Sequence, residues 1–441
     1  MNMNRVSGAA EKLLEGERKA LAVRVLTGLE SITDLADELG VSRNRGVMEF
    51  LRDVVGWSMS IGTVHGMLEA AARKAGNVNA GIDLSDVRVG LHDEIFQGSQ
   101  PVLAGVDAAS TYCYVLAGEA HRDGDTWGVH LLDARQQGLN PDYTIADAGQ
   151  GARLGQQIAL ADIPCHGDVF HIQHQFETLA NTLARIAQGD PSRGQKLQAR
   201  WDKEPSCDRA GDLAEQLDRA RKEAARSQAL ARDVRTLSHW LGHDVLSLAG
   251  PGVGVRQEMF DFVAAELHRR EHEDVRRIRP MRVALQSQRD ALLAFAKVLD
   301  EKLVAIAQSH NTSEQLVRQV CLLHRLPSSS TSYWKRWNQL RSKLTDKFHL
   351  AFDAVASAMA HTPRCSSLVE NLNSRLRTYF TLRRHLGSSY LALLQFFLNH
   401  RRSMRSRVGR QDKSPRELMT GHQHPHWFTL LGLGEPQPLR G

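Results

Sequence analysis

The stretch PVLAGVDAASTYCYVLAGEAHRDGDTWGVHLLDA, residues 101–134, decides the predicted fold class. It contains three short apolar runs, at residues 102–106, 111–117 and 127–132, with turn-forming Gly, Asp and Ser residues between them. Runs of this length bounded by turn residues are typical of strands. The pattern therefore predicts three consecutive strands joined by short turns.

The next part of the chain alternates between strand and helix patterns. Residues 141–151, PDYTIADAGQG, predict a fourth strand ending in Asp147, and a helix pattern follows at residues 152–161. Residues 163–172, IPCHGDVFHI, predict a fifth strand that runs into a helix. Three consecutive strands followed by this alternation favour an α/β fold, in which a mixed sheet carries helices on its faces.

The remaining sequence has helical patterns, and they divide the chain into four predicted regions. Residues 171–361 are rich in Ala, Leu, Arg, Gln and Glu and contain no strand pattern. Two amphipathic helices are predicted near the C-terminus, at residues 366–382 and 387–402. The regions are a helical N-terminal part (1–85), the first part of the sheet domain (86–170), a helical insertion (171–362), and the last part of the sheet domain with a basic tail (363–441).

Residues 31–58, SITDLADELGVSRNRGVMEFLRDVVGWS, have the layout of a helix-turn-helix. A Gly supplies the turn, and Ser42 is suited to cap a second helix. Arg43, Asn44 and Arg45 would then lie in its first turn, where a recognition helix presents side chains to bases and phosphates. A plain helical bundle produces the same pattern, so DNA binding is one of two interpretations of this stretch.

The composition is that of an ordinary globular protein with a mild excess of positive charge. The chain has 441 residues, of which 42% are hydrophobic, and its net charge is +6 at pH 7. Its apolar runs are shorter than the ~20 residues that span a bilayer, and the N-terminus has no signal-peptide pattern. Five scattered cysteines suit a reducing compartment. We therefore expect a cytoplasmic protein that does not enter a membrane.

Two acidic residues directly follow predicted strands. Asp107 ends the run at residues 102–106, and Asp147 ends the fourth predicted strand. Ligands gather at the carboxyl ends of strands in helix-covered sheets, and Mg²⁺ prefers carboxylate, water and phosphate oxygens. A single Asp at such a position is more often a turn residue, so the interpretation needs a third partner.

The stretch SSLVENLNSRLRTYF, residues 366–380, supplies that partner. From residue 366 to residue 410 the chain has nine arginines and no lysine, and Glu370 is the only acidic residue. Asn373 and Arg377 share the helix face of Glu370, whereas the apolar stripe lies on the opposite face. An ion pair with a neighbouring Arg is the simpler interpretation of this Glu alone. The sequence leaves open how a helix seated on the sheet would turn Glu370 toward the two Asp residues.

Three carboxylates from distant segments predict a site for phosphoryl chemistry. Two metal ions held by such a trio activate a water or a 3′-hydroxyl for in-line attack on phosphorus. The surrounding arginines would hold phosphates by forked hydrogen bonds. Without metal, the clustered carboxylates would raise one another's pKa.

A rival cluster lies in the stretch CHGDVFHIQH. Cys165, His166, His171 and His174 are zinc-ligand residue types, and the last two are about one helical turn apart. Their spacing matches no standard zinc site, because the first two are adjacent. Asp168, in the same stretch, is a candidate extra acid for the carboxylate site.

A second rival concerns the first carboxylate. Asp93 and Glu94, in the stretch HDEIF, precede the predicted strands and compete with Asp107 for the role of first ligand. We favour Asp107 because the apolar run before it is the cleaner strand pattern.

Four stretches of the chain resemble landmarks of bacterial insertion-sequence DDE transposases. The stretches are DEIFQGSQPVLAGVDAASTYCYVL (93–116), YTIADAGQGARLGQ (143–156), CHGDVFHIQHQ (165–175) and LVENLNSRLRTYF (368–380). The resemblance is closest to members with a large helical insertion, the Mutator-like group and its relatives. It implies an RNase H-like catalytic core, an N-terminal helix-turn-helix region that binds DNA ends, and a divalent-metal site of Asp, Asp and Glu.

Carried over to this chain, the resemblance places the catalytic and metal-binding carboxylates on Asp107, Asp147 and Glu370. The run E-N-x-N-x-x-x-R, which ends at Arg377, is the sharpest match. His171 matches the residue at which the insertion begins in relatives. The second Asp and the Glu are much farther apart here than in simpler members, and the predicted helical region fills that gap.

The resemblance leads to the expectation of a DNA transposase that uses Mg²⁺ or Mn²⁺, two ions per active site. Such a protein would bind double-stranded DNA at its element's inverted repeats and act as a homo-oligomer, at least a dimer. It would work in the bacterial cytoplasm, associated with the nucleoid when bound to DNA. The alternatives are a non-catalytic DNA-binding regulator and an RNase H-fold nuclease without strand transfer. The expected DNA-binding residues are Arg43, Asn44, Arg45, Asn373, Arg377, Arg383 and Arg384, with Asp168 and His171 as accessory residues.

Overall fold

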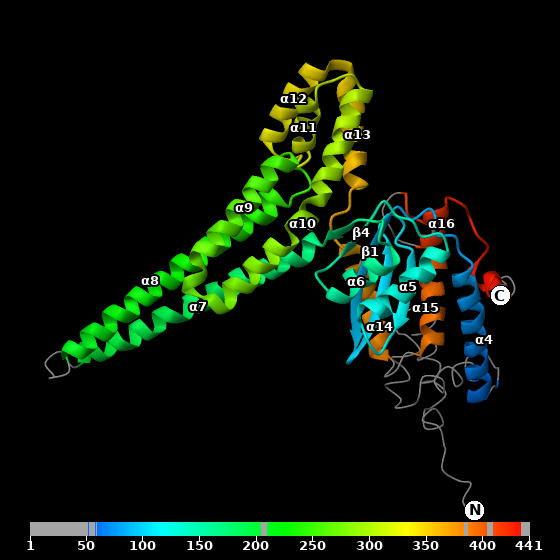
Figure 1. Cartoon of the computed structure of the whole chain (residues 1–441), viewed down its shortest axis with the longest axis horizontal. Coiled ribbons are helices and arrows are strands. Elements are labelled where there is room, and N and C mark those ends of the chain that lie inside the picture. The colour runs from blue at the N-terminus through cyan, green and yellow to red at the C-terminus, as the bar shows by residue number, and fades with distance from the viewer. Residues whose placement is uncertain are drawn as a thin grey trace, which may run out of the picture.

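The structure is a computed structural model, shown in Figure 1. The residues that it describes are 52, 58, 60–203, 210–382, 387–403 and 409–433. The predicted helix-turn-helix therefore lies almost wholly outside the described residues. The expected DNA-binding residues that lie outside them are Arg43, Asn44, Arg45, Arg383 and Arg384.

A five-stranded mixed sheet forms the centre of the molecule, with strand order β3-β2-β1-β4-β5. β1 is antiparallel to β2, and β2 is antiparallel to β3, whereas β4 is parallel to both β1 and β5. The predicted α/β architecture, a mixed sheet flanked by helices, is confirmed. The strands are β1 Val89–Gln97, β2 Gln100–Asp107, β3 Cys113–Gly118, β4 Tyr143–Ala146 and β5 Cys165–Gly167.

One strand prediction was wrong, and one strand was not predicted. The apolar run at residues 127–132 belongs to a helix, α5 (Gly124–Gln136), because Trp127, Leu131 and Ala134 recur at helical spacing and are buried. Asp123 caps that helix by accepting a hydrogen bond from the Thr126 amide. Conversely, β1 was not predicted, because the polar residues in its middle interrupt the apolar pattern.

Helices cover both faces of the sheet (Figure 1). On one face, α14 (Ser367–Leu382) and α15 (Ser388–His400) pack against β1, β2 and β3 and share an apolar core with them. On the other face, α5 and α6 (Gln150–Ala159) close a second core. α14 and α15 thus pack with the early strands around one core, although a long segment separates them in sequence.

The described residues of that intervening segment form helices joined by short connections and contain no strand, as predicted. α7 and α8 pack against each other along an arm that extends away from the sheet, and α10 returns toward β5 (Figure 1). α11, α12 and α13 build a smaller core around the end of α10. The elements are α7 Val169–Lys203, α8 Ala210–Trp240, η3 Leu241–Val245, α9 Val253–Arg270, η4 Glu271–Glu273, α10 Val275–Ser309, α11 Glu314–Leu323, α12 Thr331–Leu344, η5 Thr345–Lys347 and α13 Phe348–Ala360.

Three further helices complete the sheet-containing part. α4 (Ile61–Ala80) packs along α15, and the short helices α16 (Pro415–Thr420) and α17 (Trp427–Leu430) follow near the C-terminus. Within the described part of the chain, no helix combines the length and the apolar character needed to cross a membrane.

The contact between α5 and α6 depends on Gly155. A Cβ atom at this position would overlap Cβ of Trp127 and lie 2.8 Å from the Gly128 nitrogen. We expect Gly155→Ala to lower the free energy of unfolding by about 2 kcal/mol, because overpacking outweighs the better helix propensity of Ala. Thermal unfolding of the purified variant measures the change.

Gly66→Ala is the matched control. No described atom lies within 4 Å of the position that its Cβ would take in α4. Helix propensity alone then applies, and the substitution should stabilise the protein by up to about 1 kcal/mol. Equal shifts in both variants would contradict the steric argument.

Glu417 secures the turn that precedes α16. Its carboxylate accepts hydrogen bonds from the Arg402 guanidinium (2.6 Å) and the Ser414 amide (2.9 Å), and the Ser414 hydroxyl caps the helix in return. Burial alone would raise the pKa of Glu417, but these hydrogen bonds lower it to about 2. The carboxylate therefore stabilises the segment only while it is ionised.

We expect this stabilisation to disappear in acid. A pKa that is lower in the folded than in the unfolded state stabilises the fold above about pH 4.5, and the contribution is lost as pH falls toward 2. Glu417→Gln should remove about 2 kcal/mol at pH 7 and much less at pH 3. Hydrogen exchange of the backbone amides of residues 414 and 416–421, compared between the two proteins at each pH, measures the difference. A pH-independent difference would show that the charge of Glu417 is not the cause.

Candidate active site

Asp93 occupies a core-facing position of the central strand β1. Val89, Leu91 and Ile95 point to the α14 side of the sheet, and Asp93 belongs to the same alternating row. Only 7% of Asp93 is exposed. A carboxylate therefore lies in an otherwise apolar row, and it accepts a hydrogen bond from Asn373 of α14.

Asp147 lies beside Asp93 at the end of the neighbouring strand. The parallel register pairs His92 with Ala146, so the next residues along the two strands are Asp93 and Asp147. The charge of Asp147 acts on both Asp93 and His171. One oxygen of Asp147 accepts a hydrogen bond of 2.8 Å from the Gly149 amide, and this bond orients the side chain just before the start of α6.

Glu370 comes from the first turn of α14, on the flank of the helix. Val369, Leu372 and Leu376 are buried against the sheet and seat the helix there. Glu370 is half-buried beside this stripe. The helix thus packs through its apolar face and still brings the carboxylate to the sheet, which resolves the geometry that the sequence left open.

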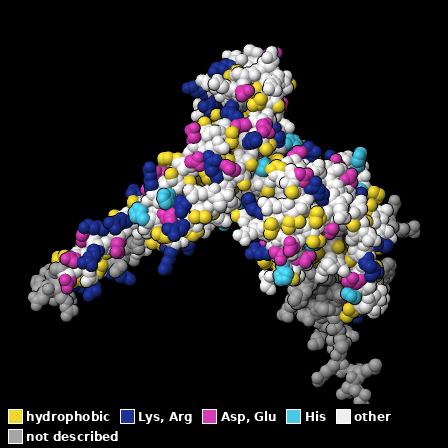
Figure 2. All heavy atoms as spheres, viewed as in Figure 1, with side chains coloured by type: hydrophobic (Ala, Val, Ile, Leu, Met, Phe, Trp, Pro, Cys, Tyr) yellow, Lys and Arg dark blue, Asp and Glu magenta, His cyan; other side chains and the backbone are white. Residues whose placement is uncertain are grey.

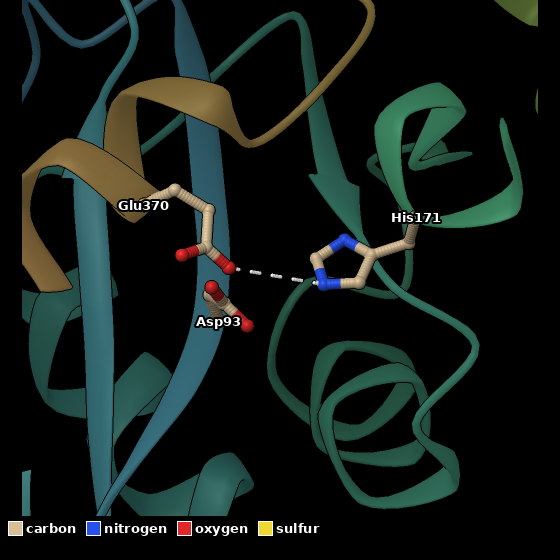
Figure 3. A group of neighbouring side chains, drawn as sticks. All are labelled: Asp93, His171 and Glu370. Carbon is tan, nitrogen blue, oxygen red and sulfur yellow. Dashed lines mark ion pairs between the residues drawn. The ribbon is translucent and has the colours of Figure 1, made fainter. Parts of the chain in front are cut away.

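The three segments converge on one small group of side chains (Figure 3). Ligand-type atoms of Asp93, His171 and Glu370 all lie within 4.8 Å of one another, and it is the one such group among the described residues. Nε2 of His171 lies 4.0 Å from Oε1 of Glu370. Strand β1, helix α7 and helix α14 each contribute one residue, so the site forms only in the folded chain.

The environment of Asp93 disfavours its charge. Its pKa is raised to about 6, mainly by burial and also by the nearby charges of Glu370 and Asp147. Hydrogen bonds from the Glu94 amide (2.8 Å) and the Asn373 amide group (2.9 Å) fix the two carboxylate oxygens. The carboxylate is therefore held rigidly in a place where negative charge accumulates.

Asp168 links the entrance of α7 to the start of α14. It is 2% exposed, and its Oδ2 accepts hydrogen bonds from His171 Nδ1 (2.8 Å) and from the amide and hydroxyl of Ser366. Burial would raise the pKa of Asp168, but the hydrogen bonds from His171 and Ser366 lower it. This buried carboxylate therefore orients the imidazole and also holds the residue that directly precedes the Glu370 helix.

His171 carries the positive charge of the group. The hydrogen bond with Asp168 is the main cause that raises its pKa to about 9, and the charges of Asp93 and Asp147 add to the effect. Because Nδ1 is bound to Asp168, Nε2 is the nitrogen that faces Glu370. His171 and Asp168, expected as accessory residues, do lie at the site.

Asp107 does not join this group. In the β1–β2 register Asp107 pairs with Gly90 and Ala104 pairs with Asp93, so the two Asp residues lie on opposite faces of the sheet. Asp107 is buried and accepts hydrogen bonds from the amide and hydroxyl of Ser110. The geometry therefore corrects the choice of Asp107 as first carboxylate in favour of Asp93.

Period-two spacing was the signal that could have found Asp93. Val89, Leu91 and Ile95 form an alternating apolar row, and an Asp inside such a row faces the core. The strand was missed because three polar residues in its middle, His92, Asp93 and Glu94, interrupt the apolar pattern.

Two residues of α14 that were expected to contact DNA, Asn373 and Arg377, differ in exposure. Asn373 is 2% exposed and donates to Asp93, so it supports the carboxylate and is not available to DNA. Arg377 is exposed on the helix and is accessible from solvent. The Asn373 expectation is corrected because this residue lies on the sheet-facing side of α14.

The alternative zinc cluster does not assemble in the described residues. His166 stacks on Tyr143 with ring centroids 4.1 Å apart, and His174 stacks on Phe170 at 6.1 Å. The nitrogen of His171 that points inward belongs to the carboxylate group instead. The buried or stacked positions of these rings account for their presence without a metal.

The carboxylate group fits a divalent cation. Its oxygens come from Asp93 and Glu370, with Asp147 adjacent, and hard oxygen ligands of this kind suit Mg²⁺ or Mn²⁺. Burial and, to a smaller extent, the charges of Glu370 and Asp147 raise the pKa of Asp93, and a cation would relieve the repulsion among these carboxylates. The hydrogen bond between Asp168 and His171 is the kind of supporting contact that orients ligands in metal sites.

Comparison of the chain with protein-family models and with curated proteins gave no match.

Proposed function

We propose that the chain is a DNA transposase whose active site is built from Asp93, Asp147 and Glu370. The observation that carries the proposal is the convergence of these carboxylates from two central strands and a C-terminal helix. Residues so far apart in sequence have no local reason to meet. Their meeting on a helix-covered sheet is what metal-dependent phosphoryl chemistry requires.

The sheet supports assignment of the core to the RNase H-like class. Three antiparallel strands are extended by two parallel ones, and the acidic residues lie on the two central neighbours, β1 and β4. A helix that packs on β1 delivers the third acidic residue. The long helical segment between β5 and α14 has the position expected of an insertion in such a core.

The protein's own residues have distinct roles in this proposal. Asp93, Asp147 and Glu370 would hold Mg²⁺ or Mn²⁺, two ions per site, and the ions would supply charge neutralisation and an activated water or 3′-hydroxyl. Asn373 keeps the Asp93 carboxylate in place through its 2.9 Å hydrogen bond. Asp168 orients His171, whose Nε2 faces Glu370.

The proposed partner is double-stranded DNA. Arg377 lies on the same flank of α14 as Glu370, within reach of a phosphate beside the carboxylates. The N-terminal helix-turn-helix pattern would recognise the element's ends, and at least two copies of the chain would be needed to join them. These steps belong to the proposal and rest on the sequence pattern.

Cleavage and joining of DNA test the proposal directly. The full chain is incubated with DNA that carries the inverted repeats flanking its gene, with Mg²⁺ and with EDTA in parallel. We expect Mg²⁺-dependent cuts at the repeat ends and products joined to target DNA. Cleavage without joined products would favour a nuclease, and binding without cleavage in Mg²⁺ or Mn²⁺ would favour a non-catalytic regulator.

A further inference from the structure

A basic pocket lies on the other flank of the helix that carries Glu370. It has a volume of about 770 Å³ and lies between α14, the end of α15 and the segment that leads into α16. Leu368, Asn371 and Arg375 line it from α14, and these residues lie about 100–160° around the helix from Glu370. Along the helix axis, Arg375 is about 7.5 Å from Glu370.

The charge of this pocket is one-sided. Its described lining includes five basic residues and no acidic one: Arg375, Arg401, Arg402, Arg410 and Lys413. Figure 2 shows a different distribution along the arm formed by α7 and α8, where acidic and basic side chains alternate. A surface on which charges of both signs alternate screens itself, whereas a pocket of one sign attracts a polyanion.

Packing of the C-terminal segment builds the pocket. Arg402 pairs with Glu417 at 2.6 Å, and the backbones of Ser403 and Lys413 join by a hydrogen bond of 3.1 Å. Arg410 donates to the carbonyl of Ala109 and so ties this segment to the loop after β2. These contacts hold the basic side chains at the pocket in the absence of any bound anion.

Three cations in the pocket are left for a ligand. Among the described residues, Arg375, Arg401 and Lys413 form no ion pair with an acidic side chain, whereas Arg402 is paired with Glu417. Arg401 lies over the ring of Phe397 at 5.5 Å, which fixes its guanidinium. The pKa of Arg375 is lowered, mainly by burial and also by the nearby charge of Arg401. Such mutual repulsion disappears when an anion binds between the groups.

We propose that this pocket binds the phosphodiester backbone of DNA next to the strand that is held at the carboxylates. The inference rests on the proposed function and extends it to a second contact surface. Forked guanidinium donors match phosphate oxygens, and the shared helix α14 fixes the distance between the pocket and the active site. Phosphate contacts of this kind set the register of the DNA and carry no base specificity.

The test measures how salt affects binding of a double-stranded DNA oligomer of arbitrary sequence to the full chain, in EDTA. We expect the double variant Arg375→Ala with Arg401→Ala to weaken binding about tenfold or more. The slope of log affinity against log salt should become shallower by about 2, because each lost phosphate contact removes about 0.9. Lys413→Glu, at an exposed side chain, should weaken binding in the same direction.

A double variant with the same loss of charge, Arg226→Ala with Arg276→Ala on α8 and α10, is the control. Both of its positions are exposed and lie outside the pocket. Equal losses in the pocket and control variants would overturn the proposal. The proposal would also be overturned if the pocket bound inorganic tripolyphosphate but the pocket variants bound DNA normally. That result would identify a site for small polyphosphates.

The cleavage assay separates the two proposals. If the wild-type chain cuts DNA in Mg²⁺ and the pocket variants bind DNA as the control does, only the pocket assignment fails. If the wild-type chain binds DNA through the pocket but never cuts it, the pocket assignment holds and the proposed function fails.

Discussion

Asp93→Asn is expected to lower the rate of Mg²⁺-dependent DNA cleavage by about 1,000-fold or more, and Asp107→Asn by less than about threefold. Asp93 is in the carboxylate group with Glu370 and His171, whereas Asp107 faces the other side of the sheet. Asn is nearly isosteric with Asp, so each variant removes a charge and little volume. Single-turnover cleavage of end-containing DNA, normalised to folded protein, measures the difference.

Two further variants complete this test. Glu370→Gln and Asp147→Asn should lose activity as Asp93→Asn does, while DNA binding in EDTA stays close to that of the wild type. Asp107→Asn controls for burial, because Asp107 is 1% exposed and accepts hydrogen bonds within the chain. Loss of cleavage in Asp107→Asn with retention in Asp93→Asn would reverse our choice of the first carboxylate.

Asp168→Asn is expected to raise the Mg²⁺ concentration needed for half-maximal cleavage by about 10- to 100-fold. An amide nitrogen in place of Oδ2 cannot accept the hydrogen bonds from His171 and Ser366. The imidazole then loses its orientation, and the start of α14, which carries Glu370, loses a buried anchor. Titration of cleavage activity with Mg²⁺ measures the shift.

This variant needs a readout that separates positioning from folding. Unpaired buried donors cost about 1–3 kcal/mol, so Asp168→Asn is also expected to unfold at lower temperature. Asp162→Asn is the control, because the exposed pair of Asp162 with Arg135 contributes little to stability. If activity falls only in proportion to the unfolded fraction and the Mg²⁺ requirement stays unchanged, Asp168 has a purely structural role.

Much of the fold was predictable from local patterns. The strands β2, β3 and β4 are short apolar runs next to turn residues, and both C-terminal helices have an apolar stripe at helical spacing. The error at α5 has a physical cause, because a run such as WGVHLL suits a strand or a helix face equally well. Tertiary burial of Trp127 and Leu131 decides between them, and the exposure of Val129 fits only the helix.

The site was predictable in part. Glu370 stood out because no other acid lies in its basic segment, and Asp147 because it ends a clean strand. The choice between Asp93 and Asp107 depended on which face of the sheet each one occupies. The alternating row of β1 indicates the face of Asp93, but the opposite face of Asp107 follows from the pairing register of β1 and β2, which is not visible within either strand. The link from Asp168 to Ser366 joins residues that are distant in sequence, so only the folded chain reveals it.

The hydrogen bond between Asp168 and Ser366 also joins the two ends of the helical arm. The chain leaves the core at Asp168 and Val169 and returns at Arg364 and Ser366, and the departing and returning backbones are hydrogen-bonded to each other. Because these hydrogen bonds fix the two ends of the arm, the positions of the carboxylates do not depend on the length of the polypeptide between them. The entropic cost of closing a longer segment grows only with the logarithm of its number of residues. Size and shape of the arm are therefore free to diverge between otherwise equivalent proteins while the chemistry at its base stays in place.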